Sequence, residues 1–304
     1  MSPFREVLVI VARELRKSFR SVKGILLLIF TVVGGGLLAY VLAQSDDVRK
    51  RQFDANGISP GAVLEAKRAG LSWWFTNTDT GHHVGSAPLL LMVLFAVSLW
   101  LVPAVVLILG FDSVSGDLQH RTLRYWAIRV RRTSYVAGKF LGLWATCAVV
   151  ALAMHVLIWV VVIARGEATL ADTVSWGFRF WLASLPILSV WCGVSVLVSS
   201  LFRLPILALL LTGGTFFLWW LLNVPVWAGP HLDALARAKD ATPEGAQALM
   251  IPSTSTMMFL YPNFYDRFLL SPFFSQTMIG LVATLGFAAV CVAGGSLIVA
   301  NRDV

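Results

Sequence analysis

The chain has 304 residues, of which 58% are hydrophobic and 13% are charged, whereas a soluble domain carries roughly 25% charged residues. This composition excludes a soluble enzyme, a secreted disulfide scaffold and a disordered chain, and it predicts an integral membrane protein. The three cysteines lie inside apolar runs, so we expect them to be packing residues rather than redox or metal-binding groups.

Six apolar runs are long enough to cross a bilayer as helices, because a hydrocarbon core of about 30 Å needs roughly 20 helical residues. The predicted spans are 24–43, 88–111, 140–163, 180–202, 204–222 and 277–300. Together they form a single transmembrane domain over residues 1–304, with long loops at 44–87 and 223–276. Pro103 and Pro186 lie inside spans two and four, where proline is expected to kink the helix.

Basic residues are distributed unequally between the two sides of these spans. The side with both termini and loop 112–139 carries 14 Lys and Arg against 5 acidic residues, whereas the other side carries 10 against 11. Because cytoplasmic segments near spans are rich in Lys and Arg, we expect both termini to be cytoplasmic, in a bacterial inner membrane. The excess positive charge of +8 is then explained by anionic membrane lipid, and no nucleic-acid partner is expected.

The N-terminal segment 1–23 has the pattern of an amphipathic helix over residues 3–22. Its apolar residues recur at helical spacing and are Phe4, Val7, Leu8, Val11, Leu15 and Phe19, with Ile10 at the margin. Charged residues, including Arg13, Glu14, Arg16 and Arg20, lie largely on the opposite arc. An apolar stripe opposite a charged arc is typical of an interfacial helix. A plain basic flank that sets the topology is the alternative.

Loop 112–139, between spans two and three, is short, charged and aromatic. Apolar residues at Leu118, Leu123, Trp126 and Ile128 are interspersed with arginines, which predicts one or two short helices. Since both ends of this loop continue directly into spans, a partner that held the loop would move both spans.

This loop resembles the corresponding loop of ABC-2-type transporter permeases. The resemblance is carried by two acidic residues, a basic-Thr-Leu step, a basic pair and a Gly-Lys step, which here are Asp112, Asp117, Arg121-Thr122-Leu123, Arg131-Arg132 and Gly138-Lys139. Two departures stand out: Asp117 replaces the more usual Glu, and the usual proline before the Ser/Thr-Arg turn is absent. The six spans, the N-terminal helix and the long loop between spans five and six resemble the same family.

The resemblance implies an all-α integral membrane fold of six transmembrane helices with an N-terminal interfacial elbow helix. The architecture would be ABC-2 (type V-like) or mechanotransmitting (type VII-like). The chain would be a permease without catalytic activity, forming a homodimer or pairing with a similar permease, and its cytoplasmic ABC ATPase partner would bind ATP and Mg²⁺. Loop 112–139 would be the coupling loop, with candidate residues Asp112, Asp117, Arg121, Thr122, Arg124, Arg131, Arg132 and Lys139. Direct ATPase contacts would be made by Asp117, Arg121, Thr122 and Arg124.

Several catalytic and energy-coupling motifs are absent from the sequence. No phosphate-binding P-loop occurs, because Gly138-Lys139 is followed by Phe140 and lacks the upstream glycine. The spans hold almost no ionisable side chains of the kind that ion-coupled carriers use, and His155 is interpreted as a neutral helix contact. No histidine or cysteine pair has metal-ligand spacing, so no metal site and no cofactor on this chain are predicted.

The expected function is ATP-driven export of an amphipathic or lipid-like cargo. Candidate pathway-lining residues are Ser98 and Trp100 in span two and Thr212, Thr215 and Trp219 in span five. One alternative is mechanotransmission to an extracytoplasmic partner protein on the long outer loops, without transport. The other is a membrane scaffold or enzyme with no ATPase. In the outer loops we expect helices near 61–69 and 231–249 and an interfacial hairpin before span six.

Overall fold

The computed structural model describes residues 2–239, 252, 254 and 256–302, which form helices joined by turns and short loops, with no β-strand among them. Six helices are long and apolar enough to cross a membrane, which confirms the predicted all-α fold with six spans. They are α2 (Val22–Ala55), α5 (Leu89–Gly110), α8 (Arg132–Ala164), α9 (Leu170–Leu201), α10 (Pro205–Lys239) and α13 (Phe274–Ala300).

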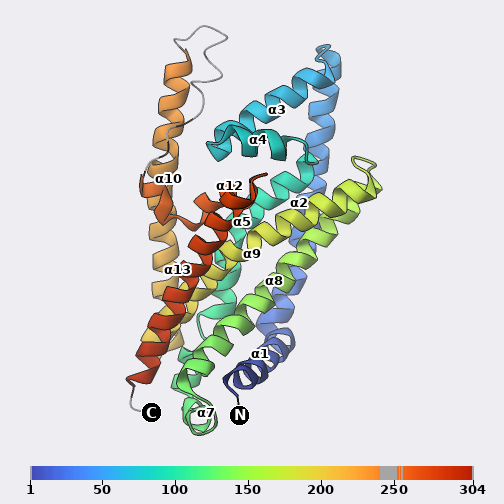
Figure 1. Cartoon of the computed structure of the whole chain (residues 1–304). Helices are drawn as coiled ribbons and strands as arrows, with labels where there is room; N and C mark the ends of the chain where they lie inside the picture. The colour runs from blue at the N-terminus through green and yellow to red at the C-terminus, as the bar shows by residue number, and fades with distance from the viewer. Residues whose placement is uncertain (1, 240–251, 253, 255, 303–304) are drawn as a thin grey trace.

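Shorter helices cover the two ends of this bundle. They are α1 (Pro3–Arg20), α3 (Pro60–Phe75), α4 (Thr78–Gly85), α6 (Ser115–Gln119), α7 (Leu123–Arg129), η1 (Thr256–Leu260), η2 (Pro262–Tyr265) and α12 (Asp266–Leu269). Figure 1 shows α1, α7 and the C-terminal end of α13 at one end of the bundle, and α3 and α4 at the other. The predicted N-terminal helix and the two short loop helices are thus confirmed as helices.

Several helices continue beyond the predicted spans. Span one was predicted to end at residue 43, but α2 continues to Ala55. In this extension, Asp46 forms ion pairs with Arg49 and Lys50, one helical turn away. Likewise, α9 begins at Leu170 rather than 180, because Thr169 caps it by accepting a hydrogen bond from the Asp172 N–H (3.1 Å). Hydropathy marks only the apolar part of each helix, whereas i,i+4 pairs and caps extend the helix into water.

The helix expected at 231–249 is present over the residues that the structure describes, but as the end of a longer helix. Residues 231–239 belong to α10, which runs without interruption from Pro205 to Lys239 past Pro225 and Pro230, while 240–249 lie outside the described residues. Its 35 residues span about 52 Å at about 1.5 Å per residue. Because a bilayer core is about 30 Å thick, α10 must project well beyond it.

Helix α9 forms the centre of the bundle and also positions the segment that follows α5. It packs against α13, α5 and α8. The Ser199 hydroxyl accepts hydrogen bonds from the N–H groups of Val114 and Ser115 (both 3.0 Å) and donates one to the Phe111 carbonyl (2.9 Å). These bonds satisfy backbone groups that the break between α5 and α6 would leave unpaired. A side chain of α9 therefore sets where loop 112–139 begins.

Helix α1 packs against α8 through a face that differs from its apolar stripe. Ile10, at the margin of that stripe, is fully buried, whereas Phe4 is 73% exposed. The two helices approach closely at Gly138, where an added Cβ would lie 2.7 Å from the Ile10 Cβ. Of the stripe residues, Phe4 and Leu8 are exposed, whereas the other four are partly buried, so only part of the stripe is left free to face lipid.

Replacing Gly138 with leucine should destabilise the α1–α8 contact, because the added side chain must displace Ile10. We expect a loss of about 1–3 kcal/mol, the usual cost of overpacking, visible as a lower midpoint of thermal unfolding in detergent. The matched control is Gly286→Leu in α13, where a Cβ meets nothing within 4 Å. Equal midpoints for the two variants would contradict this packing.

Candidate functional site

The predicted coupling loop folds into α6 and α7, joined by a tight turn at the same end of the bundle as α1 (Figure 1). Arg121 occupies the left-handed region at φ 56°, which reverses the chain direction after α6. Leu123, directly after this turn, is buried in the core and anchors the start of α7. The outer face of α7 is left exposed, with Tyr125 at 73% and Ile128 at 84%.

A buried ion cluster holds α6 in place beneath this turn. The Lys139 ammonium lies 2.9 Å from Glu14 Oε1 and 2.7 Å from Asp117 Oδ2, and its side chain is only 2% exposed. Asp117 Oδ2 also accepts a hydrogen bond from the Tyr135 hydroxyl (2.6 Å), and Asp117 Oδ1 accepts one from the Thr122 hydroxyl (3.0 Å). The cluster therefore joins α1, α6 and α8 and the turn before α7.

Asp117 and Thr122, two of the predicted ATPase contacts, bond to each other within the loop. The Asp117 carboxylate is 13% exposed, and both its oxygens are bonded within the chain. A buried charge is stable only when it is paired, so Asp117 serves the internal cluster. Lys139 has the same internal role.

Two further predicted residues attach the ends of the loop to neighbouring helices. Asp112 pairs with Lys23 at the start of α2 (2.6 Å), in a partly exposed position. The backbone N–H of Arg131 donates to Glu6 Oε2 on α1 (3.2 Å). Burial raises the pKa of the Glu6 carboxyl, but hydrogen bonds from Ser134 and Arg131 outweigh this effect, so the pKa is lowered overall. Glu6 is thus a loop-positioning residue that the sequence analysis missed.

Of the remaining predicted basic residues, some contact other parts of the chain and others are exposed at the surface. The Arg132 guanidinium donates to the carbonyls of Ala300 and Arg302 (3.1 Å for the second), so it caps the C-terminal end of α13. Arg13 lies over the Trp126 ring, 4.7 Å from its centroid. Arg16 and Arg20 are exposed on α1.

Four arginines from three separate segments line one cavity beside α7. Arg121 and Arg124 of the loop meet Arg203, from the turn between α9 and α10, and Arg302, after α13. The cavity measures about 360 Å³, and no carboxylate is among the described residues that line it. Burial, with the nearby charge of Arg203, lowers the pKa of the Arg302 guanidinium. The sequence analysis missed Arg203 and Arg302, since only folding brings them to the loop.

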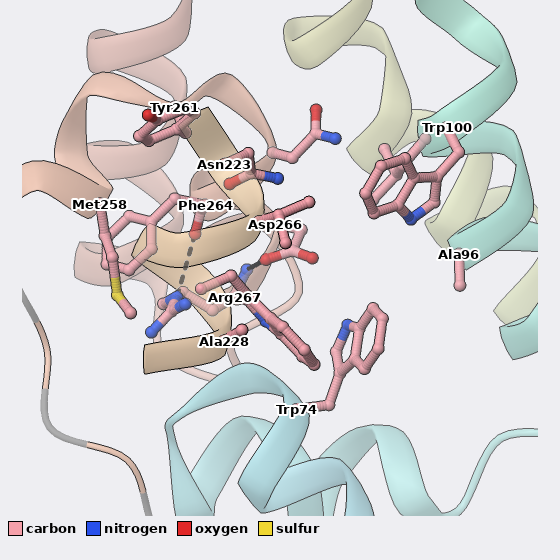
Figure 2. Close-up of a pocket in the computed structure, with 14 residues that line it drawn as sticks. Trp74, Ala96, Trp100, Asn223, Ala228, Met258, Tyr261, Phe264, Asp266 and Arg267 are labelled. Carbon is pink, nitrogen blue, oxygen red and sulfur yellow. Dashed lines mark hydrogen bonds between the residues drawn. The ribbon is translucent and has the colours of Figure 1, made fainter. Parts of the chain in front are cut away.

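The predicted pathway-lining residues differ in their surroundings. The hydroxyls of Ser98, Thr212 and Thr215 each bond a carbonyl of their own helix. Trp100 lines a cavity of about 290 Å³ nearer the α3 end of the bundle, and Trp100 and Trp219 together line a smaller one beside it. We call the larger one the tryptophan cavity, after Trp74, Trp100 and Trp227 (Figure 2).

No group of three or more His, Cys, Asp or Glu side chains that could hold a metal ion occurs among the described residues. His155 is buried and bonds the Ala151 carbonyl of its own helix (2.9 Å). His231 bonds carbonyls of Trp227 and Trp73. These histidines therefore act as packing and hydrogen-bonding residues.

Removing the central cation of the ion cluster should lower the folding stability far more than removing either carboxylate charge. Lys139→Met leaves two buried carboxylates facing each other, and we expect it to cost about 3–5 kcal/mol of stability. Asp117→Asn keeps the Lys139–Glu14 pair and should cost less. The midpoints of thermal unfolding in detergent rank the stabilities of these variants. The control is Lys23→Met, which removes the cation of the partly exposed Lys23–Asp112 pair. A Lys139→Met midpoint as high as that of Lys23→Met would refute the cluster's importance.

Comparison with known proteins places the chain in a family. A comparison with curated proteins gives no match. The family model described as "ABC-2 family transporter protein" matches residues 8–304, which include all six membrane-spanning helices and the α6–α7 loop. The chain therefore belongs to the ABC-2 family of transporter proteins, as a multi-pass permease.

Proposed function

We propose that this chain is the permease subunit of an ABC transporter whose ATPase subunit docks on α7 and the four-arginine cavity. Permeases of this family generally have no catalytic site of their own and pair with an ABC ATPase. ATP and Mg²⁺ would accordingly be bound by the partner.

The four-arginine cavity is the observation that carries this proposal. Four guanidinium groups repel one another where none of the described lining residues is a carboxylate, and an anionic partner surface relieves that repulsion. Arginine is also the side chain best suited to bidentate pairing with carboxylates. The exposed Tyr125 and Ile128 beside it supply apolar contact area, so the surface combines the charged and apolar parts of a protein interface.

The buried ion cluster would transmit movement of the ATPase to the membrane. A displacement of α7 pulls on Asp117, and through Lys139 it reaches α8 and, through Glu14, α1. We propose that this motion drives export of an amphipathic or lipid-like cargo. The tryptophan cavity supports a cargo role because it combines apolar walls with a few polar groups.

A second copy of the permease would complete the membrane part. Helix α10 is the least buried of the six spans, and one side of it exposes Leu210, Phe217 and Leu221. These residues share a helical face. That wide apolar face supports a homodimer, although a similar permease would fit the same requirement.

Mechanotransmission is the second candidate function, favoured by the length of α2 and α10. Both helices continue past their apolar segments, to Ala55 and Lys239. Such rigid extensions suit the transfer of movement to a protein outside the membrane. Reconstituted vesicles that hydrolyse ATP but move no amphipathic cargo would favour this candidate over export.

Reversing the charge of the loop arginines should abolish ATPase docking. For Arg121→Glu/Arg124→Glu, we expect at least about a tenfold loss of co-purified ATPase subunit in mild detergent, since each reversal turns attraction into repulsion. Ile128→Asp tests the apolar part of the same surface. The control is Arg51→Glu, an exposed residue of α2 at the opposite end. Undiminished ATPase recovery with the double variant would remove the basis for docking at this surface.

The topology that this proposal requires places α7 in the cytoplasm of a bacterial inner membrane, together with both termini. A membrane-impermeant maleimide should therefore label Ile58→Cys in intact cells or spheroplasts and label Ile128→Cys only in inverted vesicles. Ile58 and Ile128 are both exposed, and the three native cysteines are buried. Labelling of Ile128→Cys from outside would reverse the orientation.

A further inference from the structure

The tryptophan cavity has a chemical character of its own, independent of the loop at the other end. It lies between α3, α5, α10 and the segment from η1 to α12, and its volume is about 290 Å³. Figure 2 shows Trp74 and Trp100 on one side of it and Asn223 and Asp266 on the other. This volume lies near the lower end of the roughly 300–1,000 Å³ range of small-ligand sites, so it suits a head group rather than a whole amphipath.

A buried carboxylate faces this cavity. Asp266 is 7% exposed, and its Oδ1 accepts a hydrogen bond from the Arg267 backbone N–H (2.6 Å). In the part of the chain that the structure describes, Asp266 makes no ion pair. Burial raises the pKa of this carboxyl to about 6, and the charge and backbone N–H of Arg267 oppose the rise. A buried anion of this kind needs a positive partner.

The neighbouring Arg267 interacts electrostatically with Asp266, but the two side chains form no ion pair. Its guanidinium lies over the Phe264 ring, 3.6 Å from the centroid, and its Nε donates to the Phe264 carbonyl (3.0 Å). Figure 2 shows this guanidinium beside Phe264, on the far side of Asp266 from Trp74. Burial lowers the pKa of Arg267 to about 10, so it remains charged at neutral pH. Arg267 also lines the cavity, but its guanidinium is engaged with Phe264.

The residues that line the tryptophan cavity favour organic ammonium groups over small inorganic cations. Indole faces attract cations, and they are the usual surroundings of quaternary ammonium groups in proteins. Small inorganic cations instead require several oxygen ligands, and Asp266 is the only carboxylate among the described lining residues. We propose that the tryptophan cavity binds an organic ammonium group, with Asp266 as its counter-charge and Trp74, Trp100 and Trp227 as its walls. The group belongs either to a phospholipid head group or to a free amine.

The free-amine source is tested with choline as the probe. Full-length protein in nanodiscs of phosphatidylglycerol is titrated with choline and with its neutral carbon isostere, 3,3-dimethylbutan-1-ol, by calorimetry. If the source is a free amine, choline binds and the isostere does not. Asp266→Asn and Trp100→Leu then each weaken choline binding at least about tenfold. The matched control Asp233→Asn removes an exposed carboxylate of α10 and leaves binding unchanged.

The lipid source is tested by native mass spectrometry of the protein in mixed lipid. If the group is a head group, phosphatidylethanolamine or phosphatidylcholine is retained over phosphatidylglycerol, and Asp266→Asn abolishes the preference. A positive result in either arm supports the site and identifies its source. Overturning results are the absence of ammonium preference in both arms, or a preference that Asp266→Asn and Trp100→Leu leave unchanged while both variants unfold at the wild-type temperature.

This inference goes beyond the proposed function, because it requires neither an ATPase nor transport. Both binding measurements use the permease alone. The Arg121→Glu/Arg124→Glu variant should bind the ammonium group like the wild type. Loss of ATPase docking and loss of ammonium binding are therefore separate results, and one can fail without the other.

Discussion

The buried Lys139 ammonium, held between Glu14 and Asp117, is the interaction on which the architecture of the α1–α7 end of the bundle depends. A single cation between two carboxylates is stable only while all three helices that carry them stay in register. It fixes α6 against α1 and α8, and it leaves the turn at Arg121 and the face of α7 to project outward. The position of the exposed face of α7 therefore depends on the buried ion cluster.

The two ends of the bundle carry opposite chemistry, and α5 connects them. One end presents four guanidinium groups around a cavity, which suits an anionic protein surface. Toward the other end lies a buried carboxylate among indole rings. Trp100 of α5 lines the second cavity, and α5 ends at the break that Ser199 stabilises before α6. Loop 112–139 is thus joined directly to the same helix that forms a wall of the tryptophan cavity.

Hydropathy predicts the spans but does not predict where each helix begins and ends. The number and order of the spans follow from apolar length, because a bilayer imposes that length on any spanning helix. The ends of the helices do not follow from apolar length. The Asp46–Lys50 pair extends α2, and the Thr169 cap extends α9, beyond their apolar segments. The continuation of α10 through Pro225 and Pro230 was also missed. A proline in a sequence argues for a break, whereas packing and local adjustment can retain the helix.

By itself, the sequence determined the membrane class, six spans, the amphipathic first helix and the family resemblance of loop 112–139, because these depend on composition, period and local motif. It also identified Asp117, Arg121, Arg124 and Lys139 as important without separating their roles. Only the tertiary structure decided that Asp117 and Lys139 are buried partners while the two arginines join Arg203 and Arg302. Ion pairs and cavities are made between segments distant in the chain, and no local pattern records which side chains will meet.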